Sequence, residues 1–268
     1  MTIHAPAPSL LDAVRRRAVS EPDAGPLPTF ITIGTMKGGT SALHSYLREH
    51  PEIGMSTPKE TDFFCRADHD GHDLDWYRGL FSGSGPQFGE SSPNYTKRHL
   101  FDGVVERMQA VLPDLRLIYV VRDPIDRAVS HFLHNVHKQR VDAGDFATYF
   151  QDLDNPPLLT SPYAYQLEPF AEAYGMDRIL VMASEDLRDD RAAAMRRVFE
   201  FLGVDPEFTS PKFEIDRHVT ATKLEEAGAS TERPVLTPEQ RDAIADHLRP
   251  DIDRFRSMVG QEFAHWSV

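Results

Sequence analysis

The sequence has a single cysteine, Cys65, so no disulfide can form within the chain. It also lacks an 18-residue apolar run and a signal-type segment, and we therefore expect neither a membrane-spanning helix nor secretion. Basic residues are scarce as well, because 29 Lys and Arg stand against 42 Asp and Glu, for a formal net charge of −13. An acidic surface repels polyanions, which argues against nucleic acid or a heavily sulfated polymer as partner. These absences predict a cytoplasmic protein with no membrane partner.

What remains is typical of a globular enzyme. Of the 268 residues, 40% are hydrophobic and 26% are charged, and this length suits a large α/β domain. Residues 1–28 contain five prolines, and we expect them to form an N-terminal extension that is mobile or docked on a partner subunit. The sequence therefore predicts a single domain over residues 29–268 and leaves a homodimer possible.

The stretch FITIGTMKGGTSAL, residues 30–43, is an apolar β-type run that breaks into a glycine-rich loop. The glycines let backbone N–H groups approach an anion, and the helix that follows presents its unpaired N-terminal N–H groups and its dipole. Lys37 adds a mobile positive charge. The phosphate-binding residues that we expect here are Lys37, Gly38, Gly39, Thr40 and Ser41.

This loop differs from the nucleotide triphosphatase signature, in which the lysine follows the last glycine and directly precedes Ser or Thr. Lys37 precedes both of its glycines, and no magnesium-binding hydroxyl stands next to it. Hydrolysis of ATP with magnesium therefore fits poorly.

A second strand-to-helix turn follows the buried strand predicted at residues 115–121. Asp123 is suited to cap a helix whose first residue is Pro124. Arg122 then stands at the carboxyl end of the strand, and Ser130 lies about two turns into the helix. Ligands bind at strand ends in open α/β sheets, so two such turns imply a ligand with two separated anionic ends.

We do not expect the arginine or the histidines further along this helix to bind the anionic ligand or a metal ion. We expect Arg127 to pair with Asp123 or Asp126. Histidines at three-residue steps drift around a helix and cannot converge on one ion, so we predict no metal site at His131, His134 and His137.

The alternation of strand and helix patterns predicts a parallel sheet with helices on both faces. We expect strands near residues 30–34, 87–90, 116–121 and 178–182. We expect helices near residues 40–50, 73–80, 97–112, 124–139, 238–248 and 251–259.

Taken together, GTMKGGTSAL resembles the 5′-phosphosulfate loop, and YVVRDPIDRAVSHF resembles the 3′-phosphate motif, of sulfotransferases that use 3′-phosphoadenosine 5′-phosphosulfate (PAPS). PKETDFF, GESSPNY and SPYAYQL extend the resemblance to the heparan-sulfate branch and its bacterial relatives. It implies an α/β fold, the P-loop NTPase-like sulfotransferase fold, with a central parallel sheet flanked by helices. It also implies PAPS as donor, adenosine 3′,5′-bisphosphate (PAP) as product, no required metal, and Arg122 and Ser130 as ligands of the 3′-phosphate.

Sulfuryl transfer requires that charge be stabilised on the departing phosphate oxygen and that a proton leave the attacking group. Lys37 is our candidate for the first task, and the resemblance of PKETDFF to the acidic position of that branch makes Glu60 the candidate for the second. Glu60 is alternatively a solvated loop carboxylate, and Asp62 is the weaker candidate base. Lys59 either assists the phosphosulfate or simply pairs with Glu60.

Two departures from the family pattern stand out. Relatives often have a lysine after the glutamate of GESSPNY, where this chain has Ser91, and we expect Glu90, Ser91 and Ser92 to face the reaction centre. Relatives also often carry a basic, glycine-containing loop over the nucleotide. Only Arg233 remains of that loop, and we include it among the donor-binding residues.

The sequence thus predicts transfer of a sulfuryl group from PAPS to a hydroxyl, less favourably an amine, of a small or glycosylated acceptor. One alternative is an ATP-dependent small-molecule kinase, which ATP with magnesium would stabilise against heat more than PAP does. Another is a non-catalytic nucleotide-binding protein, which would be indifferent to the loss of Glu60. No motif in the sequence identifies the acceptor. We expect residues 65–80 and 140–165 to select it.

Overall fold

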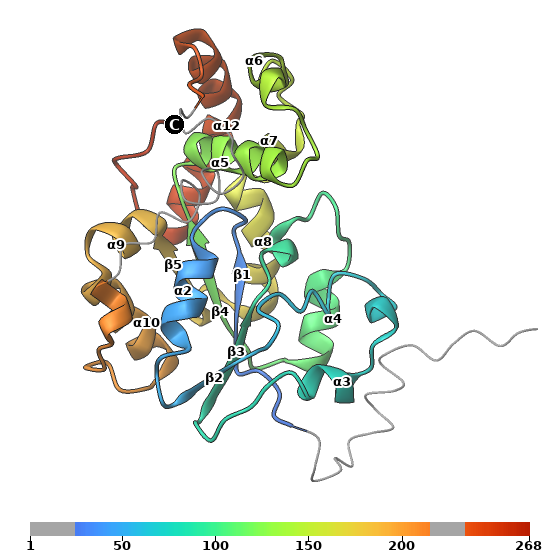
Figure 1. The fold of residues 1–268 in the computed structure, drawn as a ribbon, viewed down its shortest axis with the longest axis vertical. Helices are drawn as coiled ribbons and strands as arrows, with labels where there is room; N and C mark the ends of the chain where they lie inside the picture. Colours follow the sequence, from blue (N-terminus) through green and yellow to red (C-terminus); the bar gives the residue numbers. More distant parts are fainter. Residues whose placement is uncertain (1–24, 215–233) are drawn as a thin grey trace, which may run out of the picture.

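The computed structural model describes residues 25–214 and 234–268. Its centre is a five-stranded parallel sheet in the order β2-β3-β1-β4-β5 (Figure 1). The strands are β1 (Phe30–Gly34), β2 (Ile53–Met55), β3 (Gln87–Ser91), β4 (Arg116–Val121) and β5 (Ile179–Ala183). The four predicted strands are confirmed. The edge strand β2 was not predicted, because three residues are too few to show a periodic pattern.

Helices cover both faces of the sheet, as a parallel sheet requires. They are α2 (Thr40–Leu47), α3 (Leu74–Arg78), α4 (Val104–Val111), α5 (Pro124–His137), α6 (Phe146–Tyr149), α7 (Pro156–Leu159), α8 (Tyr163–Tyr174), α9 (Ser184–Asp189), α10 (Arg191–Leu202) and α12 (Pro238–Val259). Figure 1 shows α2 and α10 on one side of the sheet, with α4 and α8 on the other. Along β4, Ile118 and Val120 pack toward the first layer, whereas Leu117, Tyr119 and Val121 pack toward the second.

The C-terminal helix differs from the prediction of two helices divided near residue 250. The structure has one helix, Pro238–Val259, with Pro250 inside it. Proline removes one backbone N–H donor and normally interrupts a helix. Here the buried side chains of Leu248, Ile252 and Phe255 hold the two halves on one apolar face, so packing overrides the local signal.

The helix predicted from residue 97 begins later, at Val104. A short 3-10 helix, Pro93–Thr96, follows β3, and Gly103 adopts a left-handed backbone (φ 68°) just before α4. The intervening turn therefore leaves Lys97 at the carboxyl end of the sheet instead of on a helix.

Most of the predicted N-terminal extension lies outside the described residues, as does Arg233. A single domain over residues 29–268 therefore stays a prediction. None of the helices in residues 25–214 and 234–268 has both the length and the apolar character needed to cross a bilayer.

Candidate active site

The glycine-rich loop joins β1 to α2 at the carboxyl end of the sheet. Gly39 is the N-cap of α2 with φ 107°, and no side chain caps this helix end, so its first-turn N–H groups face outward for an anion. Gly38 is pressed against β4, because a Cβ atom on it would lie 2.4 Å from the carbonyl oxygen of Val120. Lys37, also in the left-handed region at φ 68°, is partly exposed at the turn. The loop has the shape predicted for an anion cradle.

The second turn connects β4 to α5 and meets the first loop directly. Thr35 N donates to Val120 O over 2.7 Å, which joins the two loops at one edge of the sheet. Asp123 caps α5 as predicted, since its Oδ1 accepts from the N–H groups of the second and third helical residues at 3.0 and 2.9 Å. Arg122 is partly exposed at the end of β4, and Ser130 lies buried on α5. The predicted ligands of the two phosphate ends therefore come from adjacent strand-to-helix units.

Arg127 makes different contacts from those predicted. Its side chain is fully buried, and it donates to Met36 O at 3.2 Å, to Ser161 Oγ at 2.8 and 3.1 Å, and to Pro157 O. The predicted pairing with an aspartate of its own helical turn is therefore wrong, because the side chain turns inward instead of along the helix surface. Burial lowers the pKa of Arg127 from its ordinary value. This guanidinium links the glycine-rich loop to the segment that precedes α8.

Glu60 and Lys59 lie beside the glycine-rich loop. Lys59 Nζ is 2.7 Å from Glu60 Oε1 and 3.4 Å from Thr40 Oγ1, the first residue of α2. The Glu60 side chain is 45% exposed, so it is open to an incoming molecule. The structure therefore places the predicted base next to the start of α2, with Lys59 between them.

Glu90 does not face the reaction centre as expected. It is fully buried and accepts four hydrogen bonds from a group that we call the hydroxyl cage: Thr61, Tyr77, Ser92 and Tyr95. The donor distances are 2.6 Å (Thr61), 2.6 Å (Tyr77), 2.5 Å (Ser92) and 3.0 Å (Tyr95). Burial raises the pKa of Glu90, and the four hydroxyl groups act in the opposite direction.

The hydroxyl cage fixes the backbone directly after Glu60. Ser92 Oγ accepts the N–H groups of Thr61 and Asp62 at 3.0 and 3.2 Å, while it donates to Glu90. Thr61 Oγ1 is held by the same carboxylate. Glu90 therefore supports the segment that carries the candidate base, through Thr61 and Ser92. No local pattern in the sequence predicts this supporting role.

Two histidines of α5 lie near the site and are held neutral. Burial lowers the pKa of His131 to about 2 and that of His134 to about 4, and the nearby charges of Arg127 and Lys37 contribute. Across the described part of the chain, no group of three or more histidine, cysteine or carboxylate side chains is arranged to hold a metal ion.

Comparison with known proteins identifies the family. Residues 27–250 match the family model described as a sulfotransferase domain. The chain belongs to the sulfotransferase family. Mouse heparan sulfate glucosamine 3-O-sulfotransferase 3B1 is 31% identical over 258 residues, which cover 88% of this chain and 64% of the relative. The resemblance drawn from the motifs is therefore confirmed, although this chain spans less than two thirds of that relative.

Solved sulfotransferase structures share the fold. A sulfotransferase from Alicyclobacillus acidocaldarius superimposes with a TM-score of 0.72 at 24% identity, covering 91% of this chain and 100% of that one. Mouse sulfotransferase SULT7A1, solved in complex with PAP, gives a TM-score of 0.51 at 16% identity, covering 86% and 87% of the two chains. The predicted sulfotransferase fold is confirmed.

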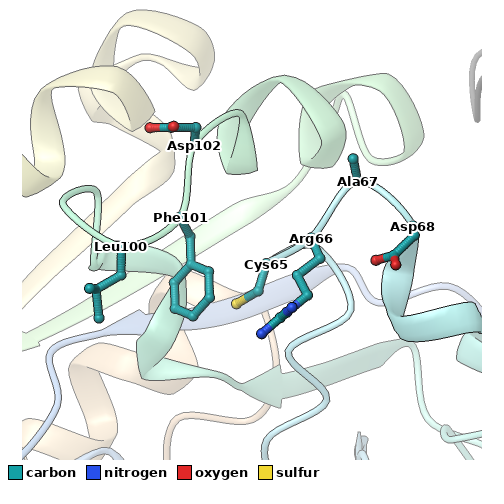
Figure 2. Close-up of a pocket in the computed structure, with 7 residues that line it drawn as sticks. All are labelled: Cys65, Arg66, Ala67, Asp68, Leu100, Phe101 and Asp102. Carbon is teal, nitrogen blue, oxygen red and sulfur yellow. The ribbon is translucent and has the colours of Figure 1, made fainter.

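In this member of the sulfotransferase family, two shallow pockets each overlap one of the segments expected to select an acceptor, residues 65–80 and 140–165. One, of about 580 Å³, has a wall from each of two loops (Figure 2). Its lining residues are Cys65, Arg66, Ala67, Asp68, Leu100, Phe101 and Asp102. Arg107 joins these walls, because it donates to Cys65 O at 3.0 Å and to Asp102 O at 2.7 Å. The other pocket, of about 490 Å³, is lined by Val136 and residues 139–143.

Proposed function

We propose that this protein transfers the sulfuryl group of PAPS to an acceptor hydroxyl and releases PAP. The observation that carries the proposal is the contact of Lys59 with both Glu60 and Thr40, at 2.7 and 3.4 Å. Through this lysine, an exposed carboxylate stands beside the N-terminus of α2, where a phosphosulfate would bind. Membership in the sulfotransferase family supports the same activity.

The donor would bind across the two joined loops. Backbone N–H groups at the start of α2 and the Lys37 ammonium suit its 5′-phosphosulfate. Arg122 and Ser130 suit the 3′-phosphate, because they stand on the neighbouring unit formed by β4 and α5. The full set of donor-binding residues that we propose is Lys37, Gly38, Gly39, Thr40, Ser41, Arg122, Ser130 and Arg233.

The chemistry needs one proton transfer and one displacement. The Glu60 carboxylate takes the proton of the acceptor O–H while that oxygen attacks sulfur. The bond between sulfur and the phosphate oxygen breaks, and the charge that develops on the departing phosphate is stabilised by Lys37. No step in this scheme requires a metal.

The acceptor that we propose is small or glycosylated, with a hydroxyl favoured over an amine. The mouse relative is named as a glucosamine 3-O-sulfotransferase, which points to a sugar hydroxyl. The net charge of −13 disfavours a heavily sulfated polymer. The pockets at residues 65–68 and 139–143 offer surfaces for such a molecule. A cytoplasmic location and a homodimer stay predictions from the sequence.

The test combines binding with product detection. Purified protein with PAPS and candidate metabolite pools should yield products that are heavier by one sulfonate group in mass spectrometry. Glu60→Gln should remove most of this turnover and keep PAP binding, whereas Lys37→Met should weaken both. Glu172→Gln, on the exposed surface of α8, is the matched control and should change neither.

Two outcomes would overturn the proposal. Stronger thermal stabilisation by ATP with magnesium than by PAP would favour a kinase. Unchanged transfer by Glu60→Gln would remove the assignment of the base.

A further inference from the structure

The side chain of Lys97 is largely buried. It is 8% exposed, and within residues 25–214 and 234–268 its Nζ atom makes neither a hydrogen bond nor an ion pair. The Nζ atom is not among the fully buried side-chain atoms that lack a partner in this part of the chain, so the stem of Lys97 is enclosed while its ammonium group reaches the surface, where a ligand can contact it.

The residues around Lys97 hold its backbone at the candidate active site. Thr96 Oγ1 donates to Ile33 O at 3.1 Å, at the end of β1 directly before the glycine-rich loop. Arg98 N donates to Gln166 Oε1 on α8 at 2.9 Å. Lys97 is thus fixed between the start of the donor loop and α8. The same turn reaches the base segment, because Asn94 Nδ2 donates to Asp62 Oδ2 at 2.8 Å.

The charges around Lys97 leave an excess of cations. Burial lowers its pKa to about 8, so the ammonium form still predominates at neutral pH. The ionisable groups that interact electrostatically with Lys97 are Glu60, Asp62, Cys65 and Arg127. Lys97 in turn contributes to the lowered pKa values of His99 and His131. Cys65 and both histidines are neutral at pH 7, because burial raises the pKa of the thiol and lowers that of each imidazole.

Lys59 pairs with Glu60 at 2.7 Å, so Lys97 and Arg127 remain against the single carboxylate of Asp62, in a chain whose net charge is −13. A bound anion would balance this local excess. The two phosphate ends of the donor already have partners in the proposed function. No separate side chain is assigned there to the sulfonate oxygens, which in this scheme lie between the start of α2 and Glu60.

We propose that Lys97 binds the sulfonate oxygens of PAPS, on the side of the transfer site that carries Glu60. This inference rests on the proposed function and adds a donor contact to it. Lys37 then serves the phosphate that departs, whereas Lys97 serves the group that moves. Because PAP lacks the sulfonate, its binding does not depend on Lys97.

The test compares two ligands that differ only in the sulfonate. Calorimetric titration of Lys97→Met should show at least a tenfold weaker affinity for PAPS and a PAP affinity within about twofold of the wild type. Lys97→Arg, which keeps the charge, should recover most of the PAPS affinity. Lys138→Met, at the exposed end of α5, is the matched control and should change neither affinity.

Each other result overturns the inference. Equal weakening of PAPS and PAP would mean that Lys97 serves the phosphates or the loop itself. Unchanged affinity for both would assign its charge to an anionic group of the acceptor. If Lys97→Met does not fold, Lys97→Gln provides the same comparison without the charge. Failure of the wild type to bind PAP would instead refute the proposed function.

Discussion

Replacing Glu90 by glutamine tests whether the hydroxyl cage holds the candidate base in place. Glu90→Gln keeps the size of the side chain but puts an N–H donor where one carboxylate oxygen stood. The hydroxyls of Thr61 and Ser92 both donate to Oε2, whereas those of Tyr77 and Tyr95 donate to Oε1. An amide satisfies only one of these two pairs, so two buried hydroxyls lose their acceptor.

The expected loss of stability follows from that count. Each buried donor left without an acceptor costs about 1–3 kcal/mol. Removal of a fully buried charge offsets part of the loss, because the carboxylate no longer has to be desolvated. We therefore expect the free energy of unfolding to fall by about 2–3 kcal/mol, which corresponds to a melting temperature about 5–10 °C lower.

Activity should respond through the base segment. With Ser92 released, the backbone of Thr61 and Asp62 loses its anchor, so kcat should fall while PAP affinity stays within about twofold. Urea unfolding, PAP titration and a transfer assay measure these three quantities. Glu106→Gln, on the exposed face of α4, is the control. Unchanged stability and kcat in Glu90→Gln would refute the reasoning, because the hydroxyl cage would then be needed neither for stability nor for the position of the base segment.

Three further predictions follow from the site. Gly38→Ala should weaken PAP binding by about 100-fold in calorimetry, because its Cβ would lie 2.4 Å from Val120 O and displace the loop. Arg127→Met should lower the free energy of unfolding by about 3 kcal/mol in urea, because several buried acceptors, Met36 O among them, lose their donor. Because the pKa of Lys97 is lowered from 10.5 to about 8, its charge opposes folding by about 3 kcal/mol below pH 8. Lys97→Met should therefore be more stable than the wild type at pH 7, and the difference should shrink between pH 8 and 10.5, as urea titrations at each pH would show.

Local signals in the sequence identified the parts of the site that depend on neighbouring residues. Asp123 followed by Pro124 predicted the start of α5, and the mostly apolar stretch at residues 115–121 predicted β4 to within one residue of its observed start. The glycine-rich loop was predicted in the same way, since the positive φ at Gly39 is a local requirement, whereas the packing of Gly38 against Val120 O is a long-range contact. These features follow from backbone geometry, which neighbouring residues largely decide.

The parts that the sequence did not predict depend on residues far apart in the chain. Glu90 was expected to face the reaction centre, but its partners Thr61 and Tyr77 lie 29 and 13 residues away. The continuous helix α12 rests on tertiary packing, which overrode the break expected at Pro250. Lys97 belongs to no recognisable motif. Its proposed role rests on its position beside the donor loop, which only the structure shows.

The contacts of Arg127 also join two regions that serve different molecules. The Arg127 guanidinium donates to Met36 O, in the donor loop, and to Ser161 Oγ, in the stretch expected to select the acceptor. A donor that orders the loop also steadies this second region, so the acceptor should bind more tightly to the donor-loaded protein. Thermodynamic linkage makes the effect mutual, so a bound acceptor should also strengthen the binding of PAPS. Equilibrium titrations should therefore find that each substrate raises the affinity for the other by the same factor.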